Sequence, residues 1–216
     1  MSNKLNKISD LRQNYNLNHL VKENVSDSPF DQFETWFEEA MNGDIYEPNA
    51  MILSTVENNQ PKSRTVLLKG FDENGFVFYS NYDSHKGQQM DANNKVSILF
   101  YWDRLQRQVR VEGSVTKIPE KISEAYFRSR PRSSQLGAWS SEQSKVIESE
   151  QVLINDLAHY TKKFENDEII PRPKNWGGYV IEPTKIEFWQ GRPSRLHDRL
   201  VYELKGSDWN ISRLSP

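Results

Sequence analysis

The sequence predicts an α+β fold in which an antiparallel β-barrel carries peripheral helices. Short apolar runs of strand length, separated by turn residues, recur after residue 50. Strands joined by short turns pair antiparallel, and about eight or nine of them with few helices between favour a barrel over a doubly wound parallel sheet. The Gly-Gly pair at 177–178 begins a strand, so it does not match a nucleotide fingerprint between a strand and a helix.

The length predicts one domain, because a single core usually organises about 100–200 residues and the chain has 216. Residues 1–27 are rich in Asn, Lys and Ser, which predicts a polar arm that is mobile unless something docks it. Residues 28–216 would form the domain. The N-terminal segment lacks an apolar leader, and no run reaches the roughly 18 apolar residues of a membrane span, so we expect a cytoplasmic protein with no membrane partner.

A helix is expected over residues 28–43. Ser28 can cap it, Pro29 suits its first position, and Gly43 ends it. Its apolar side chains recur at helical spacing and should cover a core: Phe30, Phe33, Phe37 and Met41.

Strand-like runs follow this helix: AMILSTV at 50–56, SRTVLLKGF at 63–71, FVFYSN at 76–81, KVSILFYW at 95–102 and RQVRVEGSVTKI at 107–118. A short helix is expected around 85–92. Pro119 opens another helix that Pro131 ends near Arg130, and residues 145–165 form a third, more polar one. The closing strands are WGGYVIEP, KIEFWQG, HDRLVYEL and WNISRL.

The charge balance argues against a general nucleic-acid binder. Lys and Arg number 28 against 30 Asp and Glu, for a formal charge of −2, whereas polyanion binding depends on many cationic contacts. Any anion site must therefore be local. The chain has no Cys, which excludes disulfides, cysteine nucleophiles and thiolate metal sites, and we expect no metal.

The segment RPSRLHDR is the most informative charged cluster. On an extended strand, Arg195, His197 and Arg199 would share one face. Three such groups repel one another unless the face looks at an anion, where each charge-assisted hydrogen bond contributes roughly 1.5–3 kcal/mol. A solvated edge strand with surface arginines fits the pattern equally well.

A second cluster lies in AYFRSRPRSSQLGAW. Tyr126 and Arg130 are one helical turn apart, and Pro131 should turn the chain so that Ser133 and Ser134 follow in a loop. Hydroxyl and guanidinium groups that converge in this way suit a phosphate. The alternative is an exposed basic helix end stabilised by the helix dipole.

Two further segments carry candidate phosphate ligands. Arg64 and Lys69 are five residues apart and would point to opposite faces of a regular strand, so they serve different groups or flank a bulge. In FYSNYDSHKG, strand-end hydroxyls precede a helix start whose free backbone N–H groups favour phosphate, although a plain capped helix has the same pattern.

The segments together resemble one family, whereas none is specific alone. The resembling blocks are RTVLLK at 64–69, FYSN at 78–81, RQV at 107–109, YFRSRPRSSQLGAW at 126–139, EQS at 142–144, WGGY at 176–179, IEFWQG at 186–191, RLHDR at 195–199 and the terminal RLSP. In this order they resemble the signature of the pyridoxamine 5′-phosphate oxidases, from about residue 28 to the end.

The resemblance implies a homodimer of split β-barrels with FMN bound at the subunit interface. It implies oxidation of pyridoxamine or pyridoxine 5′-phosphate to pyridoxal 5′-phosphate, with dioxygen as acceptor, hydrogen peroxide as product, and ammonia released from the amine. The FMN contacts that it implies are Arg64, Val66, Leu67, Lys69, Tyr79, Ser80, His85, Lys86, Gln108, Gln143, Ser144, Trp189 and Arg199.

The resemblance also implies the substrate site. The substrate phosphate would bind Lys69, Tyr126, Arg130 and Ser134. Arg195 and His197 would hold the pyridine ring over the flavin as the catalytic pair: Arg195 orients and stabilises charge, while His197 orients the substrate or accepts a proton. Arg12 and Tyr15 match the family's N-terminal lid, which would dock the arm.

One position departs from the family pattern, because His85 stands where the family usually has Arg. A permanent charge becomes one that titrates, so we expect FMN binding to weaken as His85 loses its proton.

Two other functions remain as alternatives. A non-catalytic split-barrel flavin-binding protein would need the flavin contacts without the substrate set. A single-stranded RNA-binding barrel would use exposed aromatic and Arg side chains, but the balanced charge and the lack of a basic stripe count against it.

Overall fold

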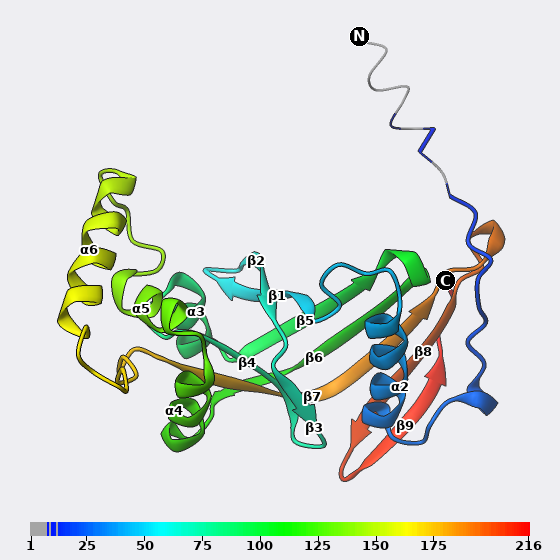
Figure 1. Cartoon of the computed structure of the whole chain (residues 1–216). Helices are drawn as coiled ribbons and strands as arrows, with labels where there is room; N and C mark the ends of the chain where they lie inside the picture. The colour runs from blue at the N-terminus through cyan, green and yellow to red at the C-terminus, as the bar shows by residue number, and fades with distance from the viewer. Residues whose placement is uncertain (1–7, 9, 12) are drawn as a thin grey trace. The chain divides into compact units, whose positions relative to one another are not determined.

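The computed structural model describes residues 8, 10–11 and 13–216. The chain forms two compact units, and segments that are distant in sequence build each one. The first unit consists of Met1–Pro48, Leu99–Val111 and Lys185–Pro216, and the second of Asn49–Ile98 and Glu112–Thr184. Figure 1 shows the elements along the chain. Among the described residues, no helix has both the length and the apolar character that crossing a bilayer requires.

The strands of the second unit form an antiparallel sheet. They are β1 (Ala50–Glu57), β2 (Gln60–Leu67), β3 (Gly70–Asp72), β4 (Gly75–Asn81) and the parts of β5 (Lys95–Trp102), β6 (Arg107–Lys117) and β7 (Trp176–Gln190) that lie in this unit. The strand order is β2-β1-β5-β6-β7-β4-β3. The pairs β1–β2 and β3–β4 are antiparallel, as the short turns between them predict. Strand β4 also pairs antiparallel with β7, which is distant in sequence.

The hairpin between β1 and β2 is made by Asn58 and Asn59, whose φ angles are 49° and 63°. Left-handed residues at both central positions are typical of the tight turn whose twist matches that of the paired strands, and Asn tolerates this conformation. The turn sets the register of the whole hairpin, so that Leu53 lies opposite Arg64.

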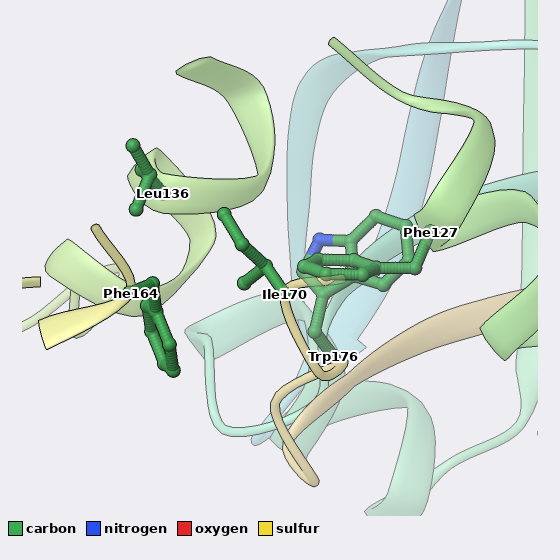
Figure 2. Close-up of a cluster of buried hydrophobic side chains, with 5 residues drawn as sticks. All are labelled: Phe127, Leu136, Phe164, Ile170 and Trp176. Carbon is green, nitrogen blue, oxygen red and sulfur yellow. The ribbon is translucent and has the colours of Figure 1, made fainter. Parts of the chain in front are cut away.

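The helices of the second unit are α3 (His85–Ala92), α4 (Glu120–Ser129), α5 (Arg132–Ser140) and α6 (Glu150–Lys163). Helices α5 and α6 pack against each other. Figure 2 shows the buried apolar cluster in this unit, made by Phe127, Leu136, Phe164, Ile170 and Trp176. The aromatic rings of Tyr79 and Tyr126 pack against this cluster, so the same apolar contacts hold two candidate site residues.

The first unit contains α2 (Pro29–Asn42), the remaining parts of β5, β6 and β7, then β8 (Asp198–Lys205) and β9 (Asp208–Arg213). Short 3-10 turns occur at η1 (Lys22–Asn24), η2 (Asp103–Leu105) and η3 (Pro193–Arg195). Strands β7, β8 and β9 are joined as antiparallel neighbours.

Helix α2 begins and ends as predicted, but its buried face differs. The Ser28 side chain accepts hydrogen bonds from the backbone N–H groups of Phe30 and Asp31, and Gly43 follows the last turn. Met41 is 54% exposed, because the face that turns inward carries Trp36, whose ring meets Phe188 edge-on at 5.2 Å. The buried residues are Pro29, Gln32, Phe33, Trp36 and Ala40.

Two segments correct the expected element boundaries. Ser133 and Ser134 lie in helix α5 and not in a loop, because Pro131 ends α4 and at once precedes a new helix. The Gln135 side chain stabilises this junction by donating to the carbonyl oxygens of Arg128 and Arg130. Residues 176–190 form one long strand, where two had been expected.

Candidate functional site

Arg64 projects from β2 in the second unit and is held by neutral oxygen atoms. Its Nη1 donates to Thr55 Oγ1 at 2.6 Å and to the Leu53 carbonyl at 3.4 Å. Its Nη2 donates to Gln89 Oε1 at 2.8 Å. No described carboxylate pairs with the guanidinium, so its charge is not neutralised by the described residues.

Lys86, in the first turn of α3, is a second cation with neutral partners. Its ammonium group donates to Ser80 Oγ at 3.1 Å, to Ser84 Oγ at 3.3 Å and to Gln143 Oε1 at 3.0 Å. The residue is only 9% exposed. Burial, and then the charge of Arg64, lower the pKa of Lys86 to about 8. Burial also lowers the pKa of Arg64. Two such cations, without a described carboxylate partner, create a site for an anion.

The second unit also contains an aromatic stack. The rings of Tyr79 and Tyr126 are stacked with centroids 3.8 Å apart, and Tyr79 also stacks on Trp176 at 5.5 Å. The Arg130 guanidinium lies over the Trp176 ring at 4.6 Å. These contacts fix the directions of Tyr126 and Arg130, the helical pair that the sequence singled out.

The guanidinium of Arg130 can donate more hydrogen bonds than it makes to the described residues. Its buried Nη1 atom has no hydrogen-bond partner among the described residues, which is unusual because buried donors are nearly always paired. The group lines a cavity of about 350 Å³ in the second unit together with Tyr79, Ser80, Ser134 and Gln143. An anionic ligand in this cavity would satisfy the unpaired donor.

The remaining predicted residues of the second unit differ in burial. Lys69 follows the end of β2 at Leu67, so it does not continue the strand, and its side chain is exposed. His85 is exposed at the first position of α3. Ser144 is exposed with a left-handed φ of 75°, whereas Val66 and Leu67 are half-buried on β2.

The first unit contains a separate pocket of about 610 Å³. Five predicted residues line it: Tyr15, Gln108, Trp189, Arg195 and His197. The ring of Tyr15 is edge-on to Trp189 and His197 at 5.9 and 5.7 Å. The predicted docking residue of the arm thus lies against His197 and lines the same pocket as Arg195, whereas Arg12 lies outside the described residues.

The segment around this pair is a turn, which corrects the expected strand. Residues Pro193–Arg195 form a 3-10 turn in which Ser194 and Arg195 have φ angles of 58° and 62°. Strand β8 begins only at Asp198. Arg195 and His197 reach the pocket through this turn, and they do not share a strand face with Arg199.

His197 is held by one backbone hydrogen bond and by an aromatic contact. The N–H of Arg192 donates to His197 Nδ1 at 3.1 Å, and the Trp189 ring lies 4.6 Å from the imidazole. Burial and the charge of Arg195 lower the pKa of His197, while Asp198 opposes them.

The partner of Arg199 was not foreseen. Arg199 donates from Nε to Glu187 Oε1 at 2.8 Å and from Nη2 to Glu187 Oε2 at 3.1 Å. Glu187 is 4% exposed. The two residues lie on the paired strands β7 and β8, and only the register of that pair brings them together.

Known proteins match nearly the whole chain. The pyridoxamine 5′-phosphate oxidase family model matches residues 37–163. A second model, the pyridoxine 5′-phosphate oxidase C-terminal dimerisation region, matches residues 176–216.

Curated relatives carry the same name. The pyridoxine/pyridoxamine 5′-phosphate oxidase of Synechocystis sp. is 52% identical over 210 residues, which cover 97% of this chain and 98% of that protein. The protein of the same name from Rubrobacter xylanophilus is 50% identical over 210 residues, with 97% and 96% coverage.

Solved structures confirm the predicted α+β split-barrel fold. The structure of PhzG from Burkholderia lata 383, in complex with tetrahydrophenazine-1-carboxylic acid, superposes with a TM-score of 0.86 at 26% identity, covering 93% of this chain and 99% of that one. An FMN-binding protein related to pyridoxamine 5′-phosphate oxidase, from Nostoc punctiforme PCC 73102, superposes with a TM-score of 0.69 at 19% identity, covering 89% and 100%. The matched models and the full-length identities show that this chain belongs to the pyridoxamine 5′-phosphate oxidase family.

Proposed function

We propose that the protein is an FMN-dependent oxidase that converts pyridoxamine or pyridoxine 5′-phosphate to pyridoxal 5′-phosphate. The observation that carries this function is the pair Arg64 and Lys86 in the second unit, whose side-chain hydrogen bonds to described residues all go to neutral oxygens. An anion bound there would offset the repulsion between the two positive charges. Family membership supports the phosphate of a flavin as that anion.

The residues of the second unit fit a phosphorylated flavin. Arg64 and Lys86 supply charge, while Ser80 and Gln143, which already accept hydrogen bonds from Lys86, lie where further polar contacts are needed. Tyr79 adds a phenol at the cavity wall. His85, Ser144, Val66 and Leu67 complete our proposed flavin contacts in this unit.

A second phosphate fits beside the aromatic stack. Arg130, whose Nη1 has no partner among the described residues, and the half-buried Ser134 line the same cavity, and Tyr126 is held one turn before Arg130. We assign the substrate phosphate to these residues and to Lys69. Two phosphates therefore have two sets of donors.

The pocket of the first unit suits an aromatic ring. Trp189 and Tyr15 supply aromatic walls, and Arg195, His197 and Gln108 supply polar groups. We assign the flavin contacts of this unit to Gln108, Trp189 and Arg199, and the orientation of the substrate ring to Arg195 and His197.

When bound, FMN supplies the acceptor for the hydride removed from the substrate's C4′ carbon. The protein contributes position and charge. Arg195 remains protonated at neutral pH, so it stabilises negative charge and cannot act as a base. His197 presents the nitrogen opposite Nδ1 to the pocket, because Nδ1 already accepts from the Arg192 backbone.

We also propose an oxidant, an assembly and a compartment for the enzyme. Dioxygen is the electron acceptor and hydrogen peroxide the product, with ammonia released from the amine substrate. The enzyme is a homodimer with FMN at the subunit interface. We place it in the cytoplasm, because phosphorylated substrate and cofactor carry charges that prevent them from crossing a membrane.

A direct assay tests this function. Purified protein should be yellow with bound flavin and should produce peroxide when pyridoxamine 5′-phosphate is added in air. Arg195→Ala and His197→Ala should keep the flavin spectrum but lose turnover. Bound flavin without peroxide production in the unmodified protein would instead support a non-catalytic flavin carrier, and protein without any flavin affinity would exclude both.

A further inference from the structure

Arg64 is oriented by two buried neutral residues, Thr55 on β1 and Gln89 on α3. Thr55 is 1% exposed and Gln89 is 5% exposed. Gln89 Oε1 accepts from Thr55 Oγ1 at 2.6 Å and from Arg64 Nη2 at 2.8 Å, and Thr55 Oγ1 accepts from Arg64 Nη1 at 2.6 Å. The three side chains close a ring of hydrogen bonds around one edge of the guanidinium.

These contacts use only some of the N–H donors of Arg64. A guanidinium has five N–H donors. Two of them go to Thr55 and Gln89 and one goes to the Leu53 carbonyl, so two have no acceptor among the described residues. They remain available for a ligand, and the ring holds the group that carries them in one direction.

The chemical identity of Gln89 matters for charge. A glutamate has the same shape and could accept the same two hydrogen bonds, but it would form a buried ion pair with Arg64. A paired guanidinium attracts a phosphate less than one whose partners are neutral. The amide therefore provides orientation without cancelling charge.

We infer that Thr55 and Gln89 are positioning residues that aim Arg64 at the flavin phosphate while leaving its positive charge uncompensated. This role rests on the proposed function. It involves no contact between Thr55 or Gln89 and the flavin, because both act through the guanidinium. It predicts that the amide at position 89 discriminates between flavins with and without a phosphate.

The test compares Gln89→Glu with Gln88→Glu. Gln88 is the exposed neighbour on the same helix, where its side chain donates to the Asp83 carbonyl, so both variants add one negative charge to α3. Affinities for FMN and for riboflavin, which lacks the phosphate, are measured from the quenching of flavin fluorescence in flavin-free protein.

Gln89→Glu should weaken FMN binding roughly 10- to 100-fold, the range expected for impairing one charge-assisted hydrogen-bond donor. Its riboflavin affinity should stay within about twofold of the unmodified protein, and Gln88→Glu should leave both affinities within this range. The new ion pair with Arg64 should leave flavin-free Gln89→Glu at least as resistant to thermal unfolding as the unmodified protein. A variant that only damaged the fold would instead lose stability and both affinities together.

A second pair of variants tests the hydroxyl. Thr55→Ser keeps the oxygen and should bind FMN like the unmodified protein, whereas Thr55→Val keeps the shape without the oxygen and should lose FMN affinity but not riboflavin affinity. Equal FMN affinity in Gln89→Glu and Gln88→Glu, or equal losses for both flavins, would overturn the positioning role alone. Failure of the unmodified protein to bind FMN would overturn the proposed function and this role together.

Discussion

The backbone N–H of Arg192 donates a hydrogen bond to Nδ1 of His197 at a distance of 3.1 Å. A backbone amide can only donate, so Nδ1 must accept and the neutral imidazole must carry its proton on Nε2. The Nε2–H group of His197 is therefore the hydrogen-bond donor on the pocket side of the ring. If Nδ1 were protonated, its N–H would point at the backbone N–H of Arg192, so two donors would face each other. Burial and the charge of Arg195 also oppose protonation, because they lower the pKa of His197 below its ordinary 6.5.

The tautomer of His197 can be measured by nitrogen NMR of protein labelled in its histidines. We expect neutral His197 with its proton on Nε2 at pH 7, and turnover that falls as the pH drops below the lowered pKa, because the charged ring loses its bond to Arg192. A charged ring at pH 7, or a proton on Nδ1, would contradict this geometry and would reopen a role in proton transfer.

Lys86 should make flavin binding depend on pH above neutrality. Its pKa in the folded protein is about 8, against an ordinary value of 10.5, so between these values the unfolded chain binds more protons than the folded one. The stability of the flavin-free protein should therefore rise with pH over this window. A bound phosphate favours the charged lysine, so flavin binding takes up a proton and weakens as the pH rises above about 8.

The expected loss of FMN affinity is at most roughly tenfold per pH unit, the limit for one linked proton. Titrations of FMN and riboflavin between pH 7 and 9.5 measure it, and only FMN should respond. Lys86→Arg keeps a charge that does not titrate in this range and should flatten the dependence. The same slope in Lys86→Arg would assign the effect to another group.

Gly191 should control how the N-terminal segment docks. A Cβ atom at this position would lie 2.8 Å from Cγ of Tyr15 and 3.1 Å from Cβ of Gln106. Gln106 holds the segment by accepting from the backbone N–H groups of Asn16 and Leu17. Gly191→Ala should therefore displace Tyr15 from the pocket, since the segment is the part that can move.

Limited proteolysis measures this displacement as faster cleavage near Tyr15, and the Michaelis constant for the substrate should rise. Gly70→Ala is the control, because a Cβ there meets nothing within 4 Å. Equal cleavage rates in the two variants would show that Gly191 does not hold the segment against the pocket.

The elements that were predicted correctly have local signals. Ser28, Pro29 and Gly43 delimit α2 by capping chemistry alone, and the Asn58-Asn59 pair forms its turn by backbone preference alone. Helix α5 was missed because Pro131 served as a stop signal, although a proline can also precede the first turn of a new helix.

The errors at the site arose from tertiary contacts. Alternating charges at 195, 197 and 199 imitate the period of a strand, but the left-handed Ser194 and Arg195 form a turn that no sequence period reveals. The sequence alone does not link Glu187 to Arg199, because their contact depends on the register of β7 and β8. A buried acidic residue within an aromatic strand, as in IEFWQ, was the available signal that a cation must lie opposite.

The pair of Glu187 and Arg199 should contribute to stability beyond any contact with flavin. Arg199→Met would leave the buried Glu187 carboxylate with Arg110, whose Nη1 lies at 3.4 Å, as its remaining cation in an ion pair. Removing one partner of a buried ion pair typically costs about 3–5 kcal/mol. We expect a loss of this order in the free energy of unfolding, measured with urea on flavin-free protein at one fixed concentration, because dimer stability depends on concentration.

Lys185 and Glu203 provide the matched control on the same two strands. Their charged groups lie 3.9 Å apart, with side chains 34% and 46% exposed, so Lys185→Met should change the free energy of unfolding by about 0–1 kcal/mol. The double variant Glu187→Met/Arg199→Met should regain much of the loss, since no uncompensated charge stays buried. If Arg199→Met were as stable as Lys185→Met, the buried pair of Glu187 and Arg199 would contribute no more to stability than an exposed one.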